Sequence, residues 1–157
     1  MHAVKFGLIS LLVAFLAGCA GTKVVVEQAY VLNHSDKFER EIIDHANVTD
    51  KGMEIFETRL DSQLSQLGDS SANEATREVE ITFTKYYMRH GAARALAGIM
   101  AGSDNITSTV VIKDSKDGKV LGKITVVSEN PTATGSAKGL IEQHADKIIS
   151  FIRTGKS

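Results

Sequence analysis

Cys19 is the only cysteine of the 157-residue chain, and its position indicates a particular chemistry. A cysteine thiol becomes a nucleophile when it is deprotonated. The residue follows an apolar run from Phe6 to Ala17, and one positive charge, Lys5, precedes that run. A charged start, a short apolar run and small residues form an export signal, and this run is too short for an ordinary membrane-spanning helix. The sequence therefore predicts an N-terminal export signal that ends just before Cys19.

The run Leu16-Ala17-Gly18-Cys19 resembles the lipobox of bacterial lipoproteins. The resemblance implies that the Cys19 thiol takes a diacylglycerol, that residues 1–18 are removed as a signal peptide, and that the new amine is acylated. Two or more acyl chains are needed for stable anchoring, since each buried methylene contributes about 0.8 kcal/mol.

The residue after the lipobox cysteine indicates which membrane holds the lipoprotein. Ala20 stands there rather than the aspartate that, in bacteria with two membranes, retains a lipoprotein in the inner membrane. We therefore expect a protein anchored in the cell outer membrane, on its periplasmic face, with residues 19–22 as a short tether. In a source with one membrane the same cysteine would anchor the chain to that membrane.

The histidines of the chain form no recognisable metal or catalytic pattern. Beyond residue 18 the chain has His34, His45, His90 and His144. No two of them are spaced i, i+4 as zinc ligands on a helix. His34 and His45 fall in a polar stretch and are expected in solvent, and His144 is expected on the second helix, beside its apolar face, at the edge between buried and exposed side chains.

The carboxylates likewise predict structure rather than catalysis. Glu78 and Glu80 share one face of an alternating segment, where solvent-exposed side chains are a better interpretation than an acid–base pair. Asp114, Asp117 and Gly118 lack the ligand spacing of a calcium loop and favour a hairpin turn. A Gly-x-Ser-x-Gly nucleophile motif is absent from the sequence. We therefore expect a protein that is not an enzyme and that has no metal centre or cofactor.

The composition of the mature chain favours one modest domain. Removal of residues 1–18 lowers Lys+Arg from 18 to 17 while Asp+Glu stays at 19, so the net charge becomes −2. This balance gives no electrostatic footprint for nucleic acid. The remaining 139 residues are enough for a single core. The sequence predicts a single periplasmic domain over residues 23–157.

The hydrophobic periodicity predicts an α+β fold. Alternating or β-branched runs predict strands over Lys23–Leu32, Glu78–Met88, Ile106–Lys113 and Lys119–Ser128. Apolar residues at helical spacing predict helices over Asp50–Leu67 and Ser136–Arg153. Residues 33–48 are expected to form a loop, with one helical turn around Phe38–Asp44.

In the second predicted strand, one set of side chains should share the buried face: Val79, Ile81, Phe83 and Tyr87. The order β-α-β-β-β-α predicts a two-layer sandwich. Both amphipathic helices should lie on one face of an antiparallel or mixed sheet of about four strands.

One segment exceeds what a strand connection needs. The fifteen residues from His90 to Asp104 are dominated by alanine and glycine. Three interpretations stand: a short helix or wide loop over the end of the sheet, a contact with a partner or membrane, or a glycine loop around a ligand. The third lacks the phosphate-binding glycine patterns. For the second interpretation the candidate contact residues are Arg94, Gly98 and Gly102.

The same region carries a family resemblance. Arg94, the Gly98–Ser103 turn, the strand from Thr107 to Lys113 and the Asp114-x-x-x-Gly-Lys-x-Leu121 hairpin are similar to the DUF4410 family of envelope lipoproteins. An aromatic residue is usual in the glycine turn of that family, and Ile99 or Met100 stands there here. The resemblance implies a small α/β domain in the envelope without an assigned activity, and it supplies no catalytic residues.

Two functions follow from these observations. The first is a non-catalytic binding or assembly module, joined to an envelope protein partner or to further copies of itself and to the membrane through its lipid. The alternative is a small-ligand-binding or enzymatic domain that uses a cleft beside residues 91–103. An exposed apolar patch or an open strand edge would favour the first function, and buried polar groups converging on a cleft would favour the alternative.

Overall fold

The computed structural model describes residues 21–33, 35–67, 75–89, 102–131 and 135–156. Within these ranges it contains five strands and two helices. In chain order they are β1 (Gly21–Gln28), β2 (Asp36–Asp44), α1 (Asp50–Leu64), β3 (Ala75–Tyr87), β4 (Asp104–Asp114), β5 (Val120–Asn130) and α3 (Ala137–Thr154).

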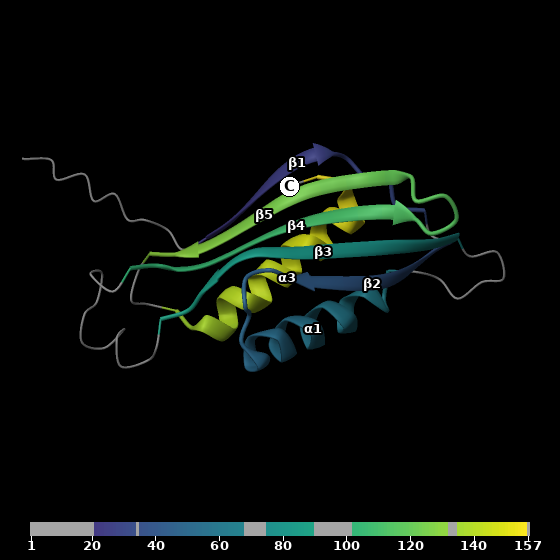
Figure 1. The fold of residues 1–157 in the computed structure, drawn as a ribbon. Helices are drawn as coiled ribbons and strands as arrows, with labels where there is room; N and C mark the ends of the chain where they lie inside the picture. Colours follow the sequence, from purple (N-terminus) through teal and green to yellow (C-terminus); the bar gives the residue numbers. More distant parts are fainter. Residues whose placement is uncertain (1–20, 34, 68–74, 90–101, 132–134, 157) are drawn as a thin grey trace, which may run out of the picture.

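The strands form one mixed sheet in the order β1-β5-β4-β3-β2. The pairs β1–β5, β5–β4 and β4–β3 are antiparallel, and β2 pairs in parallel with β3 through the crossover helix α1. Both helices lie behind the sheet in Figure 1, and the other face of the sheet, called here the open face, points toward the viewer. The predicted two-layer α+β sandwich is therefore confirmed, with one more strand than expected.

The core lies between the sheet and the helices. Alternate residues of β3 bury Val79, Ile81 and Phe83, and the helices supply apolar stripes against them. The α1 stripe includes Phe56 and Leu60, and the Phe56 ring meets the Phe83 ring edge to face at 4.9 Å. This burial pattern agrees with the helical and strand periodicities of the sequence.

The predicted helix starts agree with the structure to within one residue, as does the predicted end of α3, whereas α1 ends at Leu64 rather than at the predicted Leu67. The Thr49 hydroxyl accepts from the N–H of Gly52 at the start of α1, and the Ser136 hydroxyl accepts from the N–H of Gly139 at the start of α3. Gly155 ends α3 with φ = 67°. In the described part of the chain, neither helix combines the length and apolar content that a membrane span requires.

Strand β2 corrects the prediction of a loop over residues 33–48. The alternation of a strand is present, but Arg40 occupies one of the positions that face the helices. Its guanidinium group reaches α1, where Nε lies 2.5 Å from Asp61 Oδ1 and Nη1 lies 3.3 Å from Glu57 Oε1. A strand with a cation at its inward position has a weak apolar signature, which explains why the periodicity did not predict it.

The second correction concerns Tyr87. The register between β3 and β4 shifts between Phe83 and Lys85, which reverses the alternation beyond that point. Tyr86 therefore faces α1, and its hydroxyl lies 3.2 Å from that of Thr49. Tyr87, predicted to share the buried face, is 50% exposed.

Candidate interaction surface

The end of the sheet at which β1 begins is the part of the described structure nearest to Cys19 in the chain. Gly21 pairs with Glu129, which pairs with Asn105, which in turn pairs with Tyr87. We call this row the anchor end of the sheet. Gly21 and Thr22, which the sequence assigns to a tether, are the first residues of β1, so only Ala20 separates the strand from Cys19.

A buried ion pair holds the anchor end together. Arg89 follows β3, Asp104 begins β4, and both side chains have no exposed surface. Asp104 Oδ1 accepts from the backbone N–H of Arg89 at 2.8 Å and from its Nε at 3.2 Å. Arg89 Nη2 also donates to the backbone oxygen of Asn130, at the end of β5. Three chain segments are thereby joined.

The ion pair joins the two ends of the Gly/Ala-rich segment. Arg89 precedes these residues in the chain and Asp104 follows them, so the chain leaves and re-enters the sheet at neighbouring points of the anchor end. No role for Arg89 or Asp104 was predicted from the sequence. They have opposite charges, flank a segment of small residues, and each lies at the end of an alternating strand. This pattern could have indicated an ion pair.

The predicted site residues fall mostly outside the described ranges. Cys19, Arg94 and Gly98 lie in segments that the structure does not describe. Gly102 is described: it is exposed, its φ is 80°, and a Cβ built on it would meet no atom within 4 Å. A side chain at this position would therefore meet conformational strain but no steric obstacle from the described residues.

His144 is buried completely, which corrects its predicted place at the edge of the apolar face of its helix. Its Nε2 lies 2.7 Å from Ser108 Oγ and its Nδ1 lies 2.8 Å from Ser128 Oγ. Ser128 Oγ is also 2.8 Å from the hydroxyl of Thr22 in β1. Burial lowers the pKa of His144 to about 3, so the ring is neutral at physiological pH. Both serines have no exposed surface, so the network connects α3 to three strands and leaves no nucleophile open to a substrate.

A second polar cluster lies at the opposite end of the sheet. The Tyr30 hydroxyl donates to Asp36 Oδ2, and Arg77 donates from Nε to Asp36 Oδ1 at 2.9 Å and from Nη1 to Asp114 Oδ2. Burial raises the pKa of the Tyr30 hydroxyl, and its bond to the Asp36 carboxylate raises it further. An open hollow of about 480 Å³ adjoins Tyr30, Asp36 and Arg77. It lies at the far end from the anchor. Residues 91–101, beside which the alternative function expected a cleft, lie outside the described residues.

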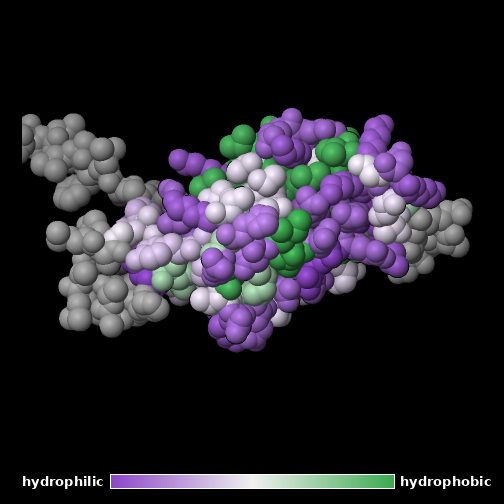
Figure 2. All heavy atoms as spheres, viewed as in Figure 1, coloured by the Kyte–Doolittle hydropathy of each residue, from purple (hydrophilic) through white to green (hydrophobic). Residues whose placement is uncertain are grey.

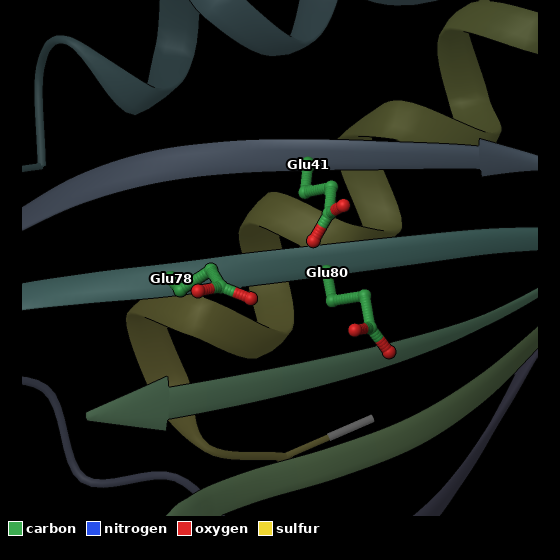
Figure 3. A group of neighbouring side chains, drawn as sticks. All are labelled: Glu41, Glu78 and Glu80. Carbon is green, nitrogen blue, oxygen red and sulfur yellow. The ribbon is translucent and has the colours of Figure 1, made fainter. Parts of the chain in front are cut away.

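The open face of the sheet carries a cluster of three glutamates that was not predicted from the sequence. Oxygens of Glu41, Glu78 and Glu80 lie within 4.8 Å of one another on β2 and β3 (Figure 3). Lys113 Nζ lies 2.5 Å from Glu80 and 3.6 Å from Glu78. The hydrogen bond to Glu80 is the main cause that raises the pKa of Lys113. The expectation of freely solvated glutamates is thus corrected: Glu78 and Glu80 belong to an ion-pair network with an ammonium group.

The two edges of the sheet differ in composition. β1 contains three consecutive valines, Val24–Val26, and Val25 on the open face is 58% exposed. Apolar side chains gather at the upper rim in Figure 2, over β1 and β5. The β2 edge is charged and carries Lys37 and Glu39, exposed by 56% and 64%. Within the described residues neither outer edge pairs with another strand.

Comparison with known proteins gives a family model and a set of structures. The model described as "Domain of unknown function (DUF4410)" matches residues 45–136. No curated protein matches the chain. A variant of the PelC dodecamer from Paraburkholderia phytofirmans is similar with a TM-score of 0.59 and 12% identity, and the match covers 85% of this chain and 98% of that chain. A PelC dodecamer of the same organism in another crystal form has a TM-score of 0.56, with the same identity and coverage.

Proposed function

We propose that this chain, which belongs to the DUF4410 family of domains of unknown function, is a lipid-anchored assembly module of the cell envelope. In this role Cys19 carries the lipid in the outer membrane, on its periplasmic face. The domain associates with further copies of itself and performs no catalysis. The observation that carries the proposal is the start of β1 at Gly21, two residues after the lipobox cysteine.

This start fixes how the domain would stand on a membrane. Two residues of extended chain span about 7 Å, which leaves no room for a flexible stalk. A lipid on Cys19 would therefore hold the anchor end of the sheet against the headgroups, with the hollow beside Tyr30 and Arg77 at the far end. Gly102 lies two residues before β4 at the same end, so a partner contact through Gly102 would be made close to the membrane.

Self-association is supported by two observations. The fold is similar to that of PelC, whose structures are titled dodecamers. The sheet also has two outer edges that pair with no described strand, and such edges invite pairing with another chain unless something covers them. Assembly needs no reactive side chain, which agrees with the sealed position of His144 between Ser108 and Ser128.

Fatty-acid labelling tests the anchor. The wild-type chain and a Cys19→Ser variant are grown with an alkyne fatty acid, and the label and membrane fraction of each are compared. A hydroxyl cannot carry the thioether-linked lipid, so the variant should lose the label and stay unprocessed. Equal labelling of the two would contradict the anchor.

The mass of the detergent-extracted wild-type protein tests assembly. Light scattering should give a multiple of the protomer mass after the detergent contribution is subtracted. A monomer at micromolar concentration would contradict the assembly role and leave the anchor intact.

A further inference from the structure

We infer that copies of this chain associate head to tail, with the β1 edge of one copy paired in antiparallel fashion to the β2 edge of the next. The inference rests on the proposed function, because it takes self-association on one membrane from there. It adds the two surfaces that meet and the register between them.

The directions of the edge strands permit this pairing. β1 is antiparallel to β5, β5 to β4 and β4 to β3, and β2 runs parallel to β3. β1 and β2 therefore run in opposite directions at opposite edges of one sheet, as Figure 1 shows. Two copies that stand the same way up would bring β1 and β2 together as antiparallel neighbours. Main-chain hydrogen bonds would then satisfy both edges.

The anchor excludes the symmetric alternative. Two β1 edges that pair with each other through a two-fold axis would run antiparallel, which places their Gly21 residues at opposite ends of the shared ladder. Eight residues of strand span about 26 Å. With the strands upright on the membrane, as the proposed function has them, a tether of two residues cannot bridge that distance, and both lipids could not enter one membrane. A head-to-tail contact keeps every anchor on the same side.

The β1 edge is only partly protected against pairing. Natural sheets protect edge strands with charges, bulges, proline or a covering segment. β1 has charges at Lys23 and Glu27 and a register shift between Val26 and Gln28, but it has no proline, its centre is three valines, and Val25 is exposed. The β2 edge has alternating charges, so pairing requires a register that matches them.

Charge complementarity selects one register. Side chains on the open face of β1 are Lys23, Val25 and Glu27, and those of β2 include Lys37, Glu39 and Glu41. When Val25 lies opposite Glu39, Lys23 lies opposite Glu41 and Glu27 lies opposite Lys37. Both charged pairs are then attractive. A shift by two residues toward Ile43 places Glu27 opposite Glu39, which is repulsive. On the helix side the selected register places Val26 beside Phe38.

Disulfide trapping tests the contact in the lipidated, full-length protein in its membrane. Cys19 is the only native cysteine, and the lipid occupies it in the mature chain, so introduced cysteines have no competitor. The pair Val25→Cys with Glu39→Cys should give a ladder of covalent multimers on oxidation. Each single variant should stay monomeric on a non-reducing gel. The matched control, Val25→Cys with Ile43→Cys, uses the same strand and face four residues out of register and should give no ladder.

A charge swap supplies a second measurement that does not depend on oxidation. Lys23→Glu should weaken association about fivefold, the loss of roughly one cross-strand charge pair. Adding Glu41→Lys should restore it.

Three outcomes would overturn the inference: a covalent dimer from Val25→Cys alone, a ladder from the Ile43→Cys control pair, or native multimers that the Glu39→Cys pair fails to trap. The last outcome would leave the proposed assembly role standing, because the multimers would then use another surface. A wild-type monomer would instead remove both.

Discussion

Each end of the sheet has an arginine–aspartate ion pair, and the two pairs differ in how far they are buried. At the anchor end, Arg89 and Asp104 are fully buried. At the far end, Arg77 keeps 15% of its side chain exposed and contacts both Asp36 and Asp114. Desolvation makes a fully buried ion pair costly to form and more costly to break on one side, whereas a partly exposed arginine can recruit water.

The difference indicates what each end is built to do. The buried pair at the anchor end fixes the ends of β3, β4 and β5 around the roots of the Gly/Ala-rich segment. The far end closes the turn between β1 and β2 through Tyr30 and Asp36, beside a hollow that water can enter. Rigidity is thus concentrated where the domain would meet the membrane and its neighbours.

The largest expected effect comes from breaking the buried pair. Asp104→Ala leaves the Arg89 charge without its main carboxylate partner and should lower the free energy of unfolding by about 3–5 kcal/mol. Denaturant titration followed by circular dichroism measures it. Asp114→Ala at the far end is the matched control and should cost far less, because Arg77 retains Asp36 and access to water. Similar losses for both variants would contradict the difference in depth between the two ends.

The second effect concerns the neutral network beside the anchor end. The pKa of His144 is lowered to about 3 in the folded state, whereas an unfolded histidine has a pKa near 6.5. The unfolded chain therefore binds the extra proton as the pH falls from about 6.5 toward 3, and stability declines over that window. Between pH 7 and pH 5 the expected loss is about 2 kcal/mol.

A His144→Gln variant separates this histidine from the other titrating groups. Glutamine can bond to Ser108 and Ser128 but does not titrate, so its stability should change less between pH 7 and pH 5. Parallel pH profiles for the two proteins would contradict the assignment of His144 as a buried neutral base. The measurement is the denaturant midpoint at each pH.

The sequence predicted the layers well because they depend on periodicity alone. The stripes of α1 and α3 and the alternation of Val79, Ile81 and Phe83 are local patterns, and each was confirmed. β2 was missed because its inward Arg40 is neutralised by carboxylates of α1, a contact formed only after folding.

The polar clusters could not be predicted for a related reason. Ser108, Ser128 and His144 are ordinary residues in the sequence, and only the strand register and the position of α3 bring them together. The register shift near Phe83, which exposes Tyr87, likewise leaves no local signature. The two unpaired edges of the sheet could be recognised only from the order of its strands, which hydrophobic periodicity does not give.

A smaller effect compares the same substitution at both ends. Tyr30→Phe removes the hydroxyl that donates to Asp36 and should cost about 1.5 kcal/mol, because a buried carboxylate loses a hydrogen bond. Tyr87→Phe at the anchor end, where the ring is 50% exposed, should change stability by less than about 0.5 kcal/mol. Thermal denaturation of both variants measures the difference. A larger loss of stability for Tyr87→Phe than for Tyr30→Phe would contradict the stabilising role of the Tyr30 hydroxyl at the far end.

An effect on stability smaller than that of Tyr30→Phe is expected at Gly102, which lies next to the Gly/Ala-rich residues and two residues before β4. Its φ of 80° is unfavourable for any side chain, and no atom of the described residues lies within 4 Å of a Cβ built on it. Gly102→Ala and Gly102→Leu should therefore cost the same, about 1 kcal/mol, because both pay for the backbone conformation and neither meets an obstacle. Equal melting temperatures for the two variants, slightly below that of the wild type, are the expected result.

Because the two variants should be equally stable, Gly102 can separate a backbone role from a contact role. If neighbouring protomers or an envelope partner approach the anchor end at this residue, leucine should reduce the yield of detergent-extracted multimers or co-purifying protein, whereas alanine should leave it near the wild-type value. Equal yields from both would make Gly102 a backbone turn and remove it from the candidate contacts. A leucine variant that unfolds while alanine does not would show that the space is filled after all. That result would contradict the open position of Gly102 and remove it as a place where a partner could approach the anchor end.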